Sequence, residues 1–209
     1  MERKTVAGDI RNRERSKKKF LDAVGQILKE EGYTALKVNN IAAKAGLDKK
    51  MIYNYFGDAD QLIDEYIHSQ DFWSNVKDEK VPTLINDGGK SFSEDMLRSQ
   101  FDYVFENKEL QKILLWRLAE ERTSLKKLAN DQEEVGEELF KSITDPHFGP
   151  KYRQFRAVMA ILISGVYYLN MASSTNSSMF CGLDIKGEED RQEIKKALSF
   201  LIDTTFKEL

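Results

Sequence analysis

Several scarcities limit what this sequence of 209 residues can be. Its one cysteine, Cys181, cannot form an internal disulfide, which fits the reducing cytoplasm. The charged N-terminus carries no apolar segment and predicts no secretory signal. The longest mostly apolar run, residues 157–169, is interrupted by Ser164 and Gly165 and is too short to cross a bilayer. We therefore expect a cytoplasmic protein with no membrane span.

Residues typical of active sites and metal sites are also scarce. The two histidines, His68 and His147, do not have the spacing of metal ligands. No glycine-rich phosphate loop follows a strand pattern, and no nucleophile elbow is present. Cys181 lies in a polar stretch and is expected to be a free surface thiol. We expect no enzyme activity, no cofactor and no metal.

Charge is distributed unevenly along the chain. Residues 1–60 hold 13 Lys and Arg against 9 Asp and Glu, a net of +4, whereas the remainder holds 19 against 26, a net of −7. A basic front on an acidic body is typical of a DNA-binding head joined to a domain that does not bind DNA.

The most informative stretch, residues 38–56, predicts two short helices joined by a tight turn. Ile41 and Ala45 share one face of the first helix, and Ile52 and Phe56 share one face of the second. Gly46 can take the left-handed conformation that ends the first helix. An alanine-glycine corner also occurs in other helical proteins, but here the small, turning and apolar positions all agree. The pattern indicates a helix-turn-helix, whose second helix enters a DNA major groove.

Cations, an amide and phenols remain on the outer side of the second helix, where they can contact phosphates and base edges. These candidate DNA-binding residues are Lys49, Lys50, Met51, Tyr53, Asn54 and Tyr55. A second basic cluster lies upstream: Arg11, Arg13, Arg15, Lys17, Lys18 and Lys19. This cluster is either a solvated, flexible end or a contact to phosphates or the minor groove.

Few prolines and regular apolar spacing predict helices throughout. We expect helices over residues 13–31, 58–73 as a connector, 92–107, 109–119, 122–143, 152–174 and 188–206, with a linker at 82–91 and a break at 145–150. The fold class is all-α. Residues 1–57 form a three-helix DNA-binding head, and residues 58–209 form a helical domain for effector binding and dimerisation.

The helix predicted over 152–174 is apolar nearly all round, so several of its faces must be buried. With the last helix it is suited to form half of a four-helix bundle across a two-fold axis, which predicts a homodimer. The alternative is a tightly packed monomer core. An apolar effector cavity is a further possibility, with five candidate lining residues: Phe101, Phe105, Trp116, Met159 and Tyr167. An aromatic stripe at helical spacing is more often part of a plain core.

Residues 13–66 resemble the TetR (tetracycline-repressor) family of bacterial transcriptional regulators. The resemblance is carried by Gly32-Tyr33, Val38-Asn39-Asn40-Ile41-Ala42, Ala45-Gly46-Leu47, Ile52-Tyr53-Asn54-Tyr55-Phe56 and Leu62. The segments 106–110 and 114–116 are similar to a recurrent part of the family's larger domain.

The resemblance implies an all-α homodimer whose heads read palindromic double-stranded operator DNA and whose larger domains bind a small-molecule effector. It places Lys37 and Asn39 at a helix start that grips phosphate. Two positions depart from the family pattern. Leu36 replaces a capping threonine, so Lys37 or Asn39 is expected to satisfy the free amides, and Ala59 replaces a lysine that touches the DNA backbone. The leading function is an effector-released repressor, and the alternative is a helical interaction module with weakened or lost DNA binding.

Overall fold

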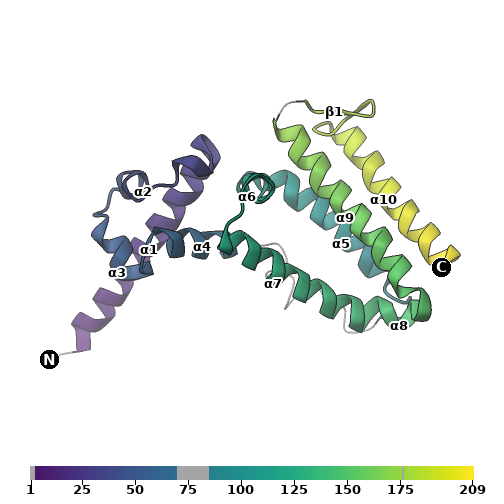
Figure 1. Ribbon diagram of the computed structural model, residues 1–209, viewed down its shortest axis with the longest axis horizontal. Coiled ribbons are helices and arrows are strands. Elements are labelled where there is room, and N and C mark those ends of the chain that lie inside the picture. The colour runs from purple at the N-terminus through teal and green to yellow at the C-terminus, as the bar shows by residue number, and fades with distance from the viewer. Residues whose placement is uncertain (1–2, 70–84, 176) are drawn as a thin grey trace. The chain divides into compact units, whose positions relative to one another are not determined.

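The computed structural model describes residues 3–69, 85–175 and 177–209, and these are helical almost throughout, which confirms the all-α fold class (Figure 1). The chain divides into two compact units. The first comprises residues 1–71 and 112–128, and the second comprises residues 72–111 and 129–209. The predicted functional division at residue 57 stays a prediction.

The first unit contains the N-terminal helices and the corner between two later ones. Its elements are α1 (Arg3–Glu31), the 3₁₀ turn η1 (Tyr33–Ala35), α2 (Val38–Ala45), α3 (Lys50–Phe56), α4 (Ala59–Ser69) and the adjoining parts of α6 (Lys108–Ala119) and α7 (Thr123–Leu139). Helix α1 begins ten residues before its predicted start at Arg13. No proline interrupts residues 3–12, so the helix continues through them. Trp73, the predicted end of the connector, lies outside the described residues.

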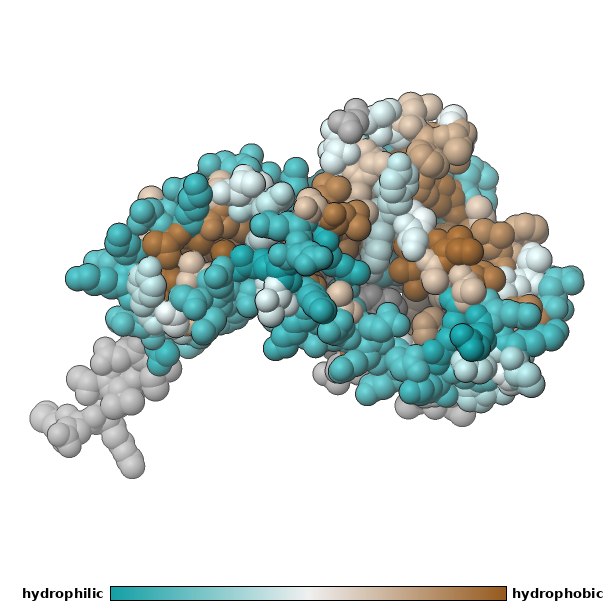
Figure 2. All heavy atoms as spheres, viewed as in Figure 1, coloured by the Kyte–Doolittle hydropathy of each residue, from teal (hydrophilic) through white to brown (hydrophobic). Residues whose placement is uncertain are grey.

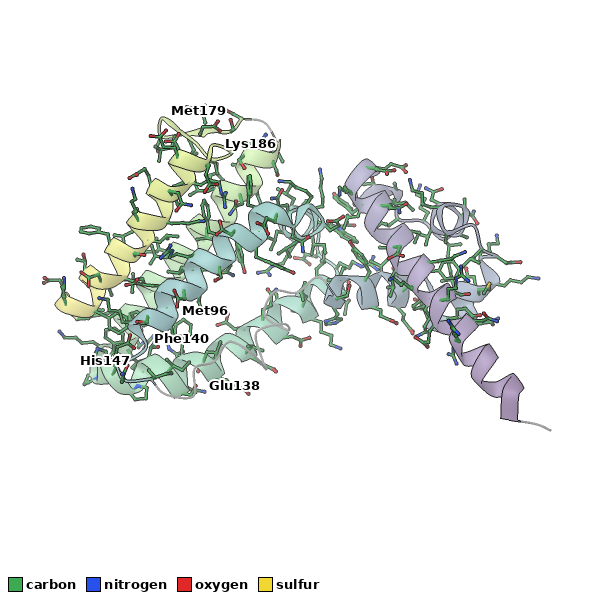
Figure 3. All side chains as sticks on the ribbon, turned by 180° about the vertical axis from the view of Figure 1, so that it is seen from behind. Met96, Glu138, Phe140, His147, Met179 and Lys186 are labelled. Atoms are coloured by element: carbon green, nitrogen blue, oxygen red, sulfur yellow. The ribbon has the colours of Figure 1, made fainter. Side chains whose placement is uncertain are left out.

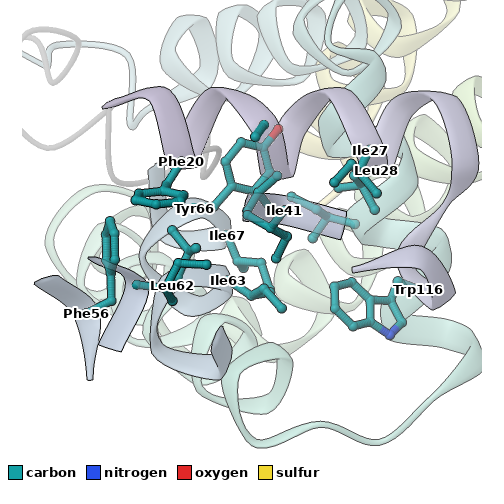
Figure 4. Close-up of a cluster of buried hydrophobic side chains, with 14 of the residues drawn as sticks. Phe20, Ile27, Leu28, Ile41, Phe56, Leu62, Ile63, Tyr66, Ile67 and Trp116 are labelled. Atoms are coloured by element: carbon teal, nitrogen blue, oxygen red, sulfur yellow. The ribbon is translucent and has the colours of Figure 1, made fainter. Parts of the chain in front are cut away.

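The core of the first unit forms along the predicted apolar stripe of α1 (Figure 4). Phe20 is fully buried, and its ring meets the ring of Phe56 edge to face at 6.1 Å between centroids. Gly25 lets α4 approach closely, because a Cβ at this position would lie 2.7 Å from the hydroxyl oxygen of Tyr66. At the other end of the cluster lies Trp116, whose indole stacks on Tyr33.

The second unit is built around three long helices. Its elements are α5 (Lys90–Glu106), the remaining parts of α6 and α7, the π-helical segment η3 (Phe140–Thr144), α8 (Asp145–Phe148), η4 (Gly149–Lys151), α9 (Tyr152–Thr175), β1 (Met179–Phe180), β2 (Leu183–Asp184) and α10 (Glu188–Glu208). Helix α5 packs against both α9 and α10, with Phe101, Phe155 and Ile202 fully buried. Figure 3 places His147 and Met179 at opposite ends of this unit.

Three connections in the second unit differ from the predictions. The break at 145–150 contains the helical turn α8, because Pro146 stands in the first turn, where no backbone N–H is required. Helix α5 begins at Lys90 rather than residue 92, and Pro82 of the predicted linker lies outside the described residues. The predicted loop before α10 holds a hairpin, which turns at Cys181 and Gly182, both at positive φ, as a two-residue hairpin turn requires.

Candidate nucleic-acid interface

The turn between α2 and α3 is closed by two backbone hydrogen bonds. The Leu47 N–H donates to the Ala42 carbonyl at 3.1 Å, and the Gly46 N–H donates to the Ala43 carbonyl at 3.2 Å. Gly46 is left-handed, with φ 65° and ψ 34°. These bonds and angles define a Schellman motif, and the Leu47 side chain packs on the core beside it. The turn therefore fixes the angle at which α3 leaves α2.

Asp48 anchors the start of α3. Its Oδ1 accepts the Lys50 N–H at 2.8 Å, and its carbonyl accepts the Met51 N–H at 3.0 Å. This cap is absent from the predicted features, although an aspartate just before a helix is a recognised signal for one. On the inner side of α3, Ile52 and Phe56 are buried, as the apolar spacing predicts.

The outer side of α3 is polar and accessible. Lys49, Lys50, Tyr53 and Asn54 are exposed, and the Tyr53 side chain is 51% accessible. Met51 and Tyr55 are half-buried and pack against the core. Two cations, an amide and a phenol are thus exposed at the start and on the outer side of one short helix.

Contacts from two other helices reach α3 and the residue that precedes it. The Arg13 guanidinium of α1 lies 5.5 Å from the centroid of the Tyr55 ring. The Lys49 ammonium donates to Asn39 Oδ1 of α2 at 3.3 Å. Each contact joins a predicted DNA-binding residue to a neighbouring helix, and each limits the freedom of a long side chain before any ligand arrives.

The start of α2 corrects one expectation. Lys37 occupies the cap position without a side-chain cap bond, and a lysine has only donors, so it cannot satisfy free amides. Asn39 Oδ1 instead accepts from Lys49, while Asn40 donates to the Ala35 carbonyl at 3.0 Å. The expected replacement cap is therefore wrong. Lys37 and Asn39 are both exposed at this helix start.

The start of α4 is organised by Asp58, whose Oδ1 accepts the Gln61 N–H at 2.7 Å. Ala59, at the position of the missing lysine, is half-buried. Asp60 and Asp64 instead face Arg122 of the chain between α6 and α7, with Arg122–Asp60 paired through a short hydrogen bond. This end of α4 therefore carries carboxylates that pair with Arg122, and position 59 supplies no cation of its own.

The five candidate effector residues are divided between the two compact units. Phe101 and Met159 are buried in the second unit, where Phe105 and Tyr167 are half-buried. Trp116 belongs to the core of the first unit instead. The Tyr167 hydroxyl accepts from Gln100 Nε2 at 2.5 Å. Their role in binding an effector stays a prediction.

A buried arginine, not anticipated from the sequence, joins three helices of the second unit. Arg191 of α10 is 2% exposed. It donates to Asp102 Oδ1 at 2.9 Å and to the Phe101 carbonyl at 3.2 Å, both on α5, and to Asn170 Oδ1 of α9 at 3.2 Å. Its guanidinium carbon lies 3.8 Å from the centroid of the Phe105 ring. A permanently charged group is thus held beside two predicted effector residues.

Asp102 is held as a carboxylate in this cluster. Burial alone would raise its pKa, but hydrogen bonds and charge from Lys195 and Arg191 outweigh burial, and the pKa lies below its ordinary value of 3.8. Lys195 Nζ lies 2.6 Å from Asp102 Oδ2. Among the described residues, no group of three or more His, Cys, Asp or Glu side chains is arranged to hold a metal ion.

Comparison with known proteins agrees with this geometry. Residues 20–66 match the family described as bacterial regulatory proteins, tetR family. A TetR-like transcriptional regulator from Rhodococcus sp. RHA1 superposes with a TM-score of 0.61 at 16% identity, covering 93% of this chain and 97% of that one. The fatty acid degradation regulator FadR from Bacillus halodurans gives 0.58 at 16% identity, covering 87% and 97%. Salmonella enterica GusR gives 0.55 at 12% identity, covering 90% and 95%.

No curated protein matches the chain in sequence. The fold and the helix-turn-helix together define a DNA-binding transcriptional regulator. Residues 20–66 therefore correspond to the N-terminal domain that defines the tetR family of regulatory proteins.

Proposed function

We propose that this protein is a homodimeric cytoplasmic repressor that binds a palindromic operator and leaves it when a small molecule binds. The observation that carries the proposal is the exposed polar side of α3, held by the Schellman turn and the Asp48 cap. Two such helices, about 34 Å apart, enter successive major grooves. Lys49, Lys50, Tyr53 and Asn54 contact phosphates and base edges there, with Met51 and Tyr55 at the margin.

The start of α2 supplies backbone contacts in this proposal. Because no side chain caps its first turn, the N–H groups there are free to bind a phosphate, which the positive end of the helix dipole favours. Lys37 and Asn39 lie accessible beside these amides. Ala59 supplies no charge, so the phosphate contacts come from α2 and α3.

Apolar side chains exposed on α9 and α10 support the dimer. Ile161 is 72% exposed and Tyr168 55% on α9, and Phe200 is 67% exposed on α10. Figure 2 shows hydrophobic surface where Figure 1 draws α9. A closely packed monomer core does not account for side chains that face outward. One helical stretch within residues 123–175 is also long and apolar enough to cross a membrane, by length and composition alone. A second copy of the chain covers such a face in a four-helix bundle.

The effector region of this proposal is the cluster around Arg191 and the aromatic side chains of α5. An effector shifts the equilibrium only if it binds one arrangement of the two heads better than the other. The guanidinium of Arg191, together with Phe101 and Phe105, combines a fixed cation with ring faces. Helix α4 follows the helix-turn-helix in the chain. In this proposal it transmits the effector's preference for one arrangement of the two heads.

The test removes two outward side chains of α3. The double variant Lys49→Ala, Tyr53→Ala should lose operator binding in a gel shift while keeping its sedimentation coefficient. A matched variant, Lys127→Ala with Tyr152→Ala, removes the same residue types from α7 and α9 and should bind as the wild type does. Undiminished binding by the α3 variant would contradict the proposal.

A second function, a helical interaction module, is favoured by one observation: Ala59 and the neighbouring carboxylates leave α4 without its usual cation. Selection from random genomic fragments distinguishes the two. An enriched palindrome supports the repressor, and failure to enrich any sequence supports the module.

A further inference from the structure

Helix α1 reaches well beyond the part of the head that the family shares. It begins at Arg3, whereas the family match begins at residue 20. Within residues 11–31, the part of α1 whose side chains are described, Phe20 is the first buried apolar residue. Residues 11–19 form more than two turns of helix ahead of the core. They contain six cations, Arg11, Arg13, Arg15, Lys17, Lys18 and Lys19, against one acid, Glu14.

Two of these cations face the head. The Arg13 guanidinium lies against Tyr55 of α3 at 5.5 Å, and Lys17 Nζ lies 5.0 Å from the centroid of the Phe56 ring. Lys17 also lies 3.8 Å from a carboxylate oxygen of Glu65. Arg13 and Lys17 are four residues apart, so they share the face of α1 that continues into the core. Their contacts place the basic turns directly beside the helix that reads DNA.

A second set of cations has no such partner. Arg11, Arg15 and Lys18 recur at intervals of four and three residues, which puts them on one face of the helix. All three are exposed. Within the described part of the chain, no carboxylate is paired with any of them. We call these three residues the outer stripe.

We propose that the outer stripe binds phosphates of the DNA flanking the bases that α3 reads. The inference rests on the proposed operator binding and adds a second, sequence-independent contact to it. Ahead of the core, α1 carries cations both on the face with Arg13 and Lys17 and on the outer stripe. A polyanion that lies along α3 is therefore expected to contact α1 as well. Guanidinium and ammonium groups are suited to phosphate oxygens and carry no information about base sequence.

DNA is favoured over an anionic membrane as the partner. A helix that lies on a membrane inserts an apolar face beside its basic one. Residues 11–19 contain no apolar side chain, and the apolar stripe that begins at Phe20 is buried in the head. The outer stripe therefore offers charge alone, and charge alone is what a phosphate backbone binds.

The experiment is the salt dependence of binding to a mixed-sequence 30-base-pair duplex, measured by fluorescence anisotropy with the full chain. Each phosphate that the protein neutralises contributes about 0.9 to the slope of log K against log salt concentration. The variant Arg11→Ala, Arg15→Ala, Lys18→Ala leaves the Arg13 and Lys17 contacts in place, and alanine preserves the helix. Its slope should be smaller by about 2 to 3 for each bound head.

A control variant, Lys112→Ala, Lys126→Ala, Lys127→Ala, removes three exposed cations from α6 and α7 and the same net charge. Its slope should equal that of the wild type. If both triple variants lower the slope equally, general charge explains the effect and the stripe proposal is overturned. An unchanged slope for the stripe variant also overturns the stripe proposal. In that case the proposed function still stands, provided that the wild type binds DNA.

Two further outcomes complete the test. Absence of wild-type binding to any duplex, including fragments selected from a genome, would remove the proposed function and the stripe with it. Sedimentation with phosphatidylserine vesicles tests the membrane: vesicle binding that depends on the stripe, with no change in the DNA slope, would overturn the assignment to DNA.

Discussion

The rings of Tyr33 and Trp116 stack at 5.0 Å between centroids and 10° between planes. Tyr33 immediately follows the glycine that ends α1, and Trp116 comes from α6, more than eighty residues later in the chain. The indole N–H donates to Glu120 at 2.7 Å, and the guanidinium of Arg122 lies 5.3 Å from the indole ring. The core of the DNA-binding unit therefore depends on a side chain outside residues 1–71.

This dependence predicts a loss of stability in the DNA-binding unit. Trp116→Ala should lower the free energy of unfolding by about 3 to 5 kcal/mol, since it empties a buried aromatic site. In a double-mutant cycle with Tyr33→Ala, measured by urea denaturation, the coupling should be about 0.5 to 1.5 kcal/mol. The pair Trp116 and Phe20, at opposite ends of the same cluster (Figure 4), should be additive. Additivity for Tyr33 and Trp116 would contradict the stacking.

Gly25 predicts a steric effect in the middle of a helix. Replacing a glycine within a helix by alanine normally raises the free energy of unfolding by about 0.5 to 1 kcal/mol. At Gly25, however, the added Cβ would lie 2.7 Å from the Tyr66 hydroxyl. Gly25→Ala should therefore destabilise the chain by about 1 to 3 kcal/mol, and by less when Tyr66 is also replaced by phenylalanine. Gly136 in α7 is the matched control, because a Cβ there would meet no atom within 4 Å, and its alanine variant should be more stable. Thermal melts of these three variants and the wild type measure the differences in stability.

Asp102 predicts a dependence on pH. Its pKa is lower in the folded chain than in the unfolded one, so the carboxylate adds stability that is complete well above pH 3.8 and is lost as the pH falls through the lowered pKa. Asp102→Asn should cost about 1 to 3 kcal/mol at pH 7, because Arg191 loses its charged acceptor. The difference from wild type should shrink below about pH 4. Denaturation curves between pH 3 and pH 7 measure it, and a cost independent of pH would contradict the role of the charge.

Substitutions on the exposed face of α9 and α10 should dissociate the proposed dimer. Ile161→Glu with Phe200→Glu places carboxylates in the proposed dimer interface, where they would be buried without partners. Light scattering should give the mass of one chain instead of two. Leu118→Glu, at a side chain 75% exposed on α6, is the control and should leave the mass unchanged. A dimeric double variant would exclude this face as the interface.

Local patterns predicted the head well. The three- and four-residue spacing of α1 and the glycine at position 46 are properties of neighbouring residues, and the structure bears them out as a buried stripe and a Schellman turn. The missed cap at Asp48 is local too and could have been recognised. The wrong expectation at Lys37 came from assigning a capping role to a side chain with no acceptor.

Long-range contacts set the limit of prediction. Arg191 stands in a polar, mostly charged run, Glu188 to Glu193, which is typical of an exposed helix. Its burial depends on Asp102, Asn170 and the ring of Phe105, which lie on other helices and leave no trace in its own neighbourhood. The place of Trp116 in the core of the first unit could not be predicted for the same reason: its sequence neighbours do not indicate that it stacks on Tyr33.

The discontinuity of the first unit also bears on synthesis. At about 5 to 20 residues per second, a ribosome needs roughly 3 to 12 seconds to extend the chain from α4 to residue 128. Until residues 112–128 emerge, Tyr33 and the neighbouring apolar side chains lack the surface that covers them. The N-terminal helices therefore cannot complete their core until residues 112–128 have been synthesised. During that interval they are accessible to chaperones and proteases.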